Sequence, residues 1–217
     1  MKETIKLTRL IALDFDGTVV DSNSVLIKFF ADYYKKNGSE LTSAALETLM
    51  PLSWQEMCIY LSRLFNLKIE EVDNTVENFT VNYYRNKAPL KPYVYEFLAE
   101  LKKYGHTVCI LSATDEDKIH MASERLGILD FFDSIITPNR VNGLSKNRPE
   151  IYYECMTQYG IKNPEEITLF DDSVEVIETA KRIGFRTVGV FDECRKETEK
   201  VLRAISDAYI HSFKELL

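Results

Sequence analysis

The sequence predicts an α/β protein in which helices cover a parallel sheet and a second, all-helical unit is inserted after the first strand. Short apolar segments alternate with amphipathic helical segments from about residue 92 onward, which is the pattern of a parallel sheet with crossover helices. The apolar run at residues 10–13 supplies another buried strand. Between residues 22 and about 88, strand signals vanish and four helical patterns follow one another.

The expected strands are short, and their residues are mostly β-branched or apolar. The helical segments between them end at glycines, which commonly stop a helix at its carboxyl end. Together these segments predict a five-stranded, Rossmann-like core with helices on both faces, followed by a candidate edge strand at residues 208–210. After the opening strand, the expected strands lie at residues 107–111, 134–136, 167–170 and 187–190.

The inserted segment predicts a small bundle of four helices. Ser53 lies three residues before Glu56, a spacing that predicts a capping box at the start of the third helix. We therefore expect a core of residues 1–20 and 89–217, and a helical cap of residues 21–88. The four helical patterns cover residues 25–36, 43–50, 53–64 and about 70–86.

Composition argues against several classes of function. The chain has 217 residues, 45% of them hydrophobic, and no segment approaches the roughly 20 apolar residues that a membrane span needs. A net charge of −7 argues against nucleic acid as the main partner. The first residues show no signal-peptide core, and the four cysteines are scattered without a C-x-x-C pair. We expect a cytoplasmic protein, monomeric or dimeric, without a membrane or nucleic-acid partner.

Two acidic residues, Asp14 and Asp16, follow the opening strand directly, in the stretch DFDGT. Residues two apart in an extended chain point to the same side, so their carboxylates are expected to lie close together. Carboxylates that close repel each other unless a cation or a shared proton offsets the repulsion. The stretch therefore predicts a metal site, acid/base chemistry, or both.

Other polar residues stand where further strands end, and ligands of a parallel sheet gather at that edge. Ser112 follows the strand at 107–111, and Asp171 and Asp172 follow the strand at 167–170. Lys146 precedes a predicted helix. Such an oxygen-rich, histidine-free set predicts a site for a phosphoryl group and Mg²⁺.

Each of these residue types has a chemical role in phosphoryl transfer. Ser112 and Lys146 would hold phosphate oxygens, together with backbone N–H groups around Phe15 and Asp16. Asp14 could attack phosphorus to give an aspartyl phosphate. Asp16 could protonate the leaving alcohol and then deprotonate the water that cleaves the intermediate.

The order and content of these motifs resemble the haloacid dehalogenase superfamily, in the helical-cap branch that holds phosphoglycolate phosphatases and β-phosphoglucomutases. The matching stretches are DFDGTVVDS from Asp14, Ser112, Lys146 and residues 170–173, and the resemblance covers nearly the whole chain. It implies that Asp14 is the nucleophile and Asp16 the general acid/base. It also implies metal ligands: Asp14, Asp172, the main-chain carbonyl of Asp16, and Asp171 directly or through water.

The resemblance leaves the reaction open. We expect a Mg²⁺-dependent phosphatase acting on a small phosphorylated metabolite, because dehalogenases of this superfamily lack the acid/base aspartate that Asp16 supplies. A sugar phosphomutase would need an additional basic phosphate site in the cap loop, and no Lys or Arg lies between Pro51 and Gln55. A non-catalytic phosphometabolite-binding protein is the third alternative. The family also places Trp54 and Ser53 where a substrate-reading loop enters the site.

Overall fold

The computed structural model describes residues 8–217 and contains a six-stranded sheet in which every neighbouring pair of strands is parallel. The strand order is β3-β2-β1-β4-β5-β6, so the opening strand lies inside the sheet. The α/β fold with an inserted helical cap is confirmed. The strands are β1 (Leu10–Leu13), β2 (Thr107–Leu111), β3 (Ser134–Ile136), β4 (Ile167–Asp171), β5 (Arg186–Val190) and β6 (Ala208–Ile210).

The expected strands therefore lie at the predicted places, with three differences. β5 begins one residue earlier than predicted, at Arg186. The candidate edge strand at 208–210 pairs with β5 and makes a sixth member of the sheet. β4 runs one residue further than predicted and includes Asp171. Residues 1–7 of the predicted core segment 1–20 lie outside the described residues.

The register places the carboxyl ends of the central strands side by side. Leu13, the last residue of β1, pairs with Ile110 of β2 and with Phe170 of β4. All four residues of β1 are buried, as expected for a strand covered on both faces. Whatever follows β1 and β4 consequently emerges at one edge of the sheet.

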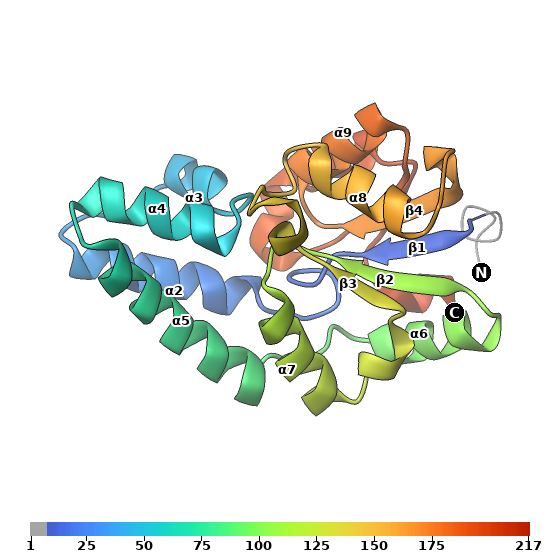
Figure 1. Ribbon diagram of the computed structural model, residues 1–217, viewed down its shortest axis with the longest axis horizontal. Coiled ribbons are helices and arrows are strands. Elements are labelled where there is room, and N and C mark those ends of the chain that lie inside the picture. Colours follow the sequence, from blue (N-terminus) through green and yellow to red (C-terminus); the bar gives the residue numbers. More distant parts are fainter. Residues whose placement is uncertain (1–7) are drawn as a thin grey trace.

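Helices cover the two faces of the sheet (Figure 1). Odd and even positions of β1 enter two separate clusters: Ile11 and Leu13 pack with helices α6 and α7, while Leu10 and Ala12 pack with α8 and α9. The core helices are α6 (Val94–Lys103), α7 (Glu116–Leu126), α8 (Glu150–Gln158), α9 (Val174–Ile183) and α10 (Glu199–Ile205). Short 3₁₀ turns are η1 (Leu129–Phe131), η2 (Pro138–Val141), η3 (Pro164–Glu166), η4 (Glu193–Thr198) and η5 (Phe213–Leu216).

Four helices between β1 and β2 form the cap, which stands beyond the end of the sheet to which β1 points (Figure 1). The capping box is present, because the Ser53 side chain accepts from the Glu56 N–H and Glu56 accepts from the Ser53 N–H. Phe30 and Tyr34 of the first cap helix are buried against Trp54 and Phe65 of the third, and Tyr84 is buried against Phe15 of the core. The cap helices are α2 (Asn23–Lys36), α3 (Ser43–Leu49), α4 (Trp54–Phe65) and α5 (Ile69–Asn86).

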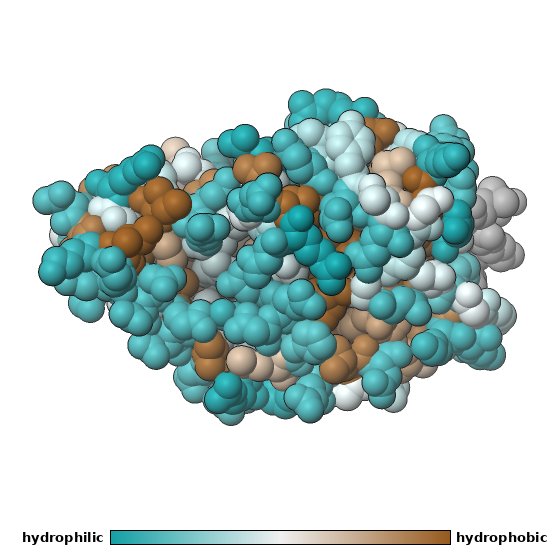
Figure 2. All heavy atoms as spheres, in the orientation of Figure 1, coloured by the Kyte–Doolittle hydropathy of each residue, from teal (hydrophilic) through white to brown (hydrophobic). Residues whose placement is uncertain are grey.

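The surface on the face shown in Figure 2 is mainly hydrophilic, with hydrophobic residues in small separate groups. Within residues 8–217, no helix has both the length and the apolar character to cross a membrane.

Candidate active site

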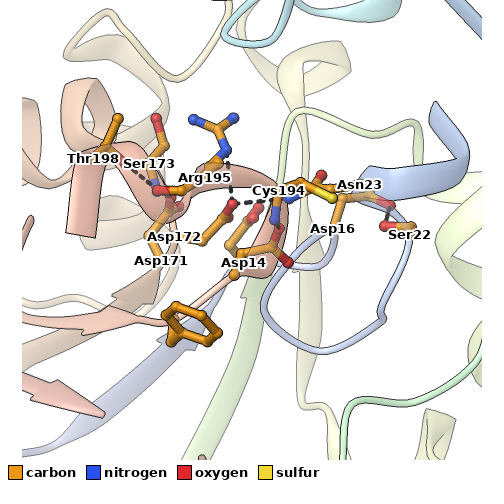
Figure 3. A network of polar contacts seen from close by, with 12 residues as sticks. Asp14, Asp16, Ser22, Asn23, Asp171, Asp172, Ser173, Cys194, Arg195 and Thr198 are labelled. Carbon is orange, nitrogen blue, oxygen red and sulfur yellow. Dashed lines mark hydrogen bonds and ion pairs between the residues drawn. The ribbon is translucent and has the colours of Figure 1, made fainter. Parts of the chain in front are cut away.

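Three buried carboxylates meet at the carboxyl edge of the sheet, at the boundary with the cap. Asp14 follows β1, Asp171 ends β4 and Asp172 comes next. One oxygen of each lies within 4.8 Å of the others, so the three can share one cation. The sequence expectation that the acids of two different strands converge is therefore met at this edge, and Figure 3 shows the three side chains together.

Lys146 lies against two of these carboxylates. Its Nζ donates to Oδ1 of Asp14 at 2.7 Å and to Oδ2 of Asp171 at 2.6 Å, and its side chain is 3% exposed. Burial opposes a charged ammonium, but the two carboxylates outweigh burial and raise the pKa of Lys146 above its ordinary value. The Tyr152 hydroxyl donates to the Lys146 carbonyl at 2.8 Å, which anchors the loop before α8.

Burial and mutual repulsion raise the pKa values of the other two acids. Removal from water raises the pKa of Asp171 to about 7 and that of Asp172 to about 6, although Lys146 and Arg195 oppose these shifts. A bound cation would stabilise the ionised form of these buried carboxylates. The donor set is entirely oxygen, which fits a hard divalent cation such as Mg²⁺.

Asn23 and Arg195 both contact the same oxygen of the Asp172 carboxylate. The Asn23 side-chain amide donates to Oδ2 at 2.9 Å, and Nε of Arg195 lies 2.9 Å from Oδ2. The contact of Arg195 with Asp172 is close enough for an ion pair, but the Nε–H is not aligned for a hydrogen bond. The other oxygen of Asp172 has no hydrogen-bond or ion-pair partner within the described chain, so it remains free to bind a cation.

Gly17 permits the close approach of Asn23 and Asp172. Its φ is +76°, a left-handed conformation that side chains disfavour, and a Cβ there would lie 2.2 Å from the Asn23 amide nitrogen. The same Cβ would lie 2.6 Å from Oδ2 of Asp172. The glycine of the DFDGT stretch is therefore required by the geometry of the site.

The Asp16 carboxylate has a different set of partners from Asp14. Ser22 and Tyr84 donate to its Oδ1 at 2.5 and 2.8 Å, and Thr114 donates to its Oδ2 at 2.5 Å. Burial raises the pKa of Asp16, and these hydrogen bonds oppose the rise. Because the side chain is held by these donors, a metal role for Asp16 would fall to its main-chain carbonyl, which stays a prediction.

The two predicted phosphate-binding positions beside Asp14 are both buried. The Ser112 hydroxyl accepts from the Thr114 N–H at 3.2 Å, which leaves the hydroxyl hydrogen available to a ligand. The Phe15 side chain is fully buried, with its ring 6.2 Å from that of Tyr84, so only its backbone could reach a ligand.

A cavity of about 70 Å³ opens onto these residues between core and cap. Trp54 lies in its wall, whereas Ser53 does not, because the Ser53 hydroxyl caps α4 and donates to the Gly143 carbonyl at 2.8 Å. The cavity is lined from the core by Asp14, Asp16, Ser112, Ala113, Thr114, Lys146, Asp171, Asp172, Ser173, Val176 and Arg195, and from the cap by Asn23, Leu26, Phe30, Met50, Pro51, Leu52, Trp54 and Met57.

Several residues of the site were not predicted from the sequence; besides Thr114, which donates to Asp16, they include Asn23, Tyr84 and Arg195. Asn23 directly follows the DFDGTVVDS motif but looks like an ordinary helix start. Only its position next to Ser22 could have indicated that it belongs to the site. Tyr84 matches the apolar stripe of α5 and looked like cap core. Arg195 lies in η4, a turn after β5 that carries no motif.

The fold and the site together define a capped α/β hydrolase with an acidic metal centre. The chain belongs to the haloacid dehalogenase-like hydrolases, because the model of that family matches residues 11–190.

Comparisons with individual proteins agree with this assignment. Pyrophosphatase PpaX of Oceanobacillus iheyensis is 24% identical over 209 residues, which cover 96% of this chain and 95% of that protein. PpaX of Bacillus velezensis is 27% identical over 192 residues, covering 86% and 85% of the two chains.

Solved structures share the fold. CbbY from Rhodobacter sphaeroides, solved in complex with phosphate, has a TM-score of 0.78 at 20% identity and covers 96% of each chain. The β-phosphoglucomutase from Clostridium difficile has a TM-score of 0.78 at 19% identity, covering 97% of this chain and 93% of that one.

Proposed function

We propose that this hydrolase is a Mg²⁺-dependent phosphatase that removes the phosphoryl group of a small phosphorylated metabolite. The observation that carries the proposal is the Asp14 carboxylate, which lies at a small cavity, accepts from Lys146 and is close enough to Asp171 and Asp172 to share one cation with them. A cationic ammonium and a cation-binding set around one carboxylate suit an anionic phosphoryl ligand.

The chemistry divides between Asp14 and Asp16. An Asp14 oxygen attacks phosphorus and forms an aspartyl phosphate, while the bond from phosphorus to the leaving oxygen breaks. Protonated Asp16 gives its proton to that oxygen, and its raised pKa favours the acid form for this step. Asp16 then takes a proton from water, which attacks phosphorus, releases inorganic phosphate and restores Asp14.

The surrounding residues bind and shield the phosphoryl group. Ser112 and Lys146 would hold its oxygens, together with N–H groups of Phe15 and Asp16. Asp14, Asp171 and Asp172 would hold Mg²⁺, which supplies positive charge to the phosphoryl oxygens when bound. Trp54 and other apolar cap residues cover the cavity, so they exclude water and contact the leaving group.

Two alternatives have weaker support. A sugar phosphomutase shares these motifs, and one structural neighbour carries that name, but the cap loop offers no basic residue between Pro51 and Gln55. A non-catalytic binding protein would not need both Asp14 and Asp16, and the chain retains both. We propose that the enzyme acts in the cytoplasm as a monomer or dimer, with the cap at residues 21–88.

A panel of small phosphorylated compounds tests this function. The panel includes pyrophosphate, since relatives carry the name pyrophosphatase, together with phosphoglycolate and hexose phosphates. We expect phosphate release that requires Mg²⁺ and is abolished in Asp14→Asn. Isomerisation of a sugar phosphate without phosphate release would instead support the mutase, and folded protein inactive in both assays would support the binding protein.

A further inference from the structure

Arg195 reaches the active-site cavity from a turn that belongs to none of the expected motifs. Its side chain is 19% exposed and lines the same cavity as Asp14 and Lys146. The turn is held in place by a buried ion pair, 2.9 Å between Lys91 and Asp192, and Lys91 also donates to the Phe191 carbonyl at 2.7 Å. Arg195 is thus placed by a fixed framework.

The positive charge of Arg195 is not required to neutralise the proposed metal centre. The carboxylates of Asp14, Asp171 and Asp172, the ammonium of Lys146 and one divalent cation have no net formal charge between them. The positive charge of Arg195 then has no unmatched carboxylate in this group. Asp172 would then be shared between Arg195 and the cation, and a buried charge that is only partly paired favours an additional anion beside it.

Most donors of Arg195 are also available. Only Nε approaches Asp172, and the two terminal nitrogens have no hydrogen-bond or ion-pair partner anywhere in residues 8–217. Figure 3 shows the guanidinium directed away from the three carboxylates. Its terminal nitrogens form the fork that binds a carboxylate or a phosphate through two parallel hydrogen bonds.

The position of Arg195 sets where such an anion can lie. A neighbouring cavity of about 170 Å³ shares Met50, Pro51 and Arg195 with the active-site cavity. Three glutamates, Glu47, Glu175 and Glu197, line this neighbour and would repel an anion. This repulsion favours the active-site cavity, which Arg195 also lines, as the place for the anion.

We propose that Arg195 recognises a second anionic group, so that the preferred substrates carry a phosphate or a carboxylate besides the phosphoryl group that is removed. This rests on the proposed phosphatase function and names its substrate class. The cap loop that could otherwise supply such a contact has no basic residue between Pro51 and Gln55. Arg195 is then a specificity-determining residue supplied by the core.

Binding of paired inert ligands tests this without turnover. Methylphosphonate is compared with methylenediphosphonate, and ethylphosphonate with phosphonoacetate, by calorimetry at saturating Mg²⁺. The two pairs separate a second phosphate-like group from a second carboxylate. The proteins are the wild type, Arg195→Gln, Arg195→Lys and, as a matched control, Lys196→Ala, which alters the neighbouring exposed cation.

We expect the wild type and Lys196→Ala to bind at least one doubly anionic ligand about 10- to 100-fold more tightly than its singly anionic partner. Arg195→Gln is expected to lose this preference while still binding the single anions, and Arg195→Lys to retain part of it. Equal weakening of both members of a pair would assign Arg195 to holding Asp172 alone and overturn the proposal. Equal affinity of the wild type for the singly and doubly anionic ligands of both pairs would also overturn the proposal.

The same variants separate this inference from the phosphatase function. If no compound in the phosphatase panel releases phosphate but the binding preference depends on Arg195, the phosphatase proposal fails and the recognition role stands. If phosphate is released at rates that Arg195→Gln lowers equally for singly and doubly anionic esters, the phosphatase function stands and the recognition role fails.

Discussion

The Tyr84 hydroxyl, on cap helix α5, donates a 2.8 Å hydrogen bond to the Asp16 carboxylate of the core. This contact joins the cap directly to the proposed general acid/base. It also favours the ionised form of Asp16, against the burial that raises the pKa of this acid. The cap therefore influences the protonation of the proposed general acid in addition to covering the cavity.

Replacing Tyr84 by phenylalanine should move the pH profile of the enzyme. Without this donor, the pKa of Asp16 rises further, so the acid form persists to higher pH and the alkaline limb of kcat/KM moves to higher pH. Tyr83→Phe is the control, because the Tyr83 hydroxyl makes only a 3.5 Å contact with the Asp21 carbonyl. Identical profiles for the two variants would contradict the role of Tyr84.

Asn23 should tune metal affinity. Asn23→Leu keeps a similar volume but removes the donor to Asp172. Because partners that orient a metal ligand typically contribute 10- to 100-fold in affinity, we expect about 10-fold weaker Mg²⁺ binding by calorimetry. Ser24→Ala changes the exposed neighbour and should leave the affinity unaltered. An unchanged affinity in Asn23→Leu would contradict the orienting role.

Stability without metal should fall as pH rises. The folded-state pKa values of Asp171 and Asp172, about 7 and about 6, exceed the ordinary 3.8, so the folded chain binds more protons than the unfolded chain between these limits. The free energy of unfolding therefore decreases from about pH 4 to pH 7. In EDTA we expect Tm to drop on the order of 5 °C between pH 5.5 and 8.

Magnesium should reverse this trend, because a bound cation stabilises the ionised carboxylates. The rise in Tm on adding Mg²⁺ should be larger at pH 8 than at pH 5.5. Asp171→Asn is the control, since it removes one of the two titrating groups. Equal Mg²⁺ shifts at the two pH values would show that these acids do not titrate in this range.

Ser53 and Trp54 are adjacent but should respond differently. Ser53→Ala removes the N-cap of α4 and the hydrogen bond to the Gly143 carbonyl, so Tm should fall by about 3–6 °C. Thr42→Ala removes only the N-cap of α3, so its Tm should fall less. Trp54→Ala should raise KM, because Trp54 lines the cavity. A KM change in Ser53→Ala with no loss of stability would restore Ser53 as a substrate contact.

The sequence predicted the fold and the gathering of acids at one edge of the sheet because both follow from local patterns. The apolar run before Asp14 and the strand before Asp171 are buried on both faces, and the parallel register brings their ends together. The helices of the cap carried clear amphipathic stripes and, at Ser53, a capping box. In these segments, local preference and tertiary structure agree.

The residues that escaped prediction act through contacts distant in sequence. Tyr84 is 68 residues from Asp16, and Asn23 is 149 residues from Asp172. Arg195 breaks the regular backbone of η4 with φ −120° and ψ 23°, and no periodicity indicates where its side chain points. Such contacts depend on how cap and core meet, which local patterns do not encode.

The proposal that Asp14 forms a covalent aspartyl phosphate is tested most directly by trapping this intermediate. The enzyme is mixed with its best substrate and Mg²⁺, quenched with acid during turnover, digested and analysed by mass spectrometry. If Asp14 is the nucleophile, the peptide that contains it carries one added phosphoryl group, which is sensitive to hydroxylamine and absent in Asp14→Asn. Phosphate release without any phosphorylated Asp14 peptide, or with undiminished turnover in Asp14→Asn, would contradict it.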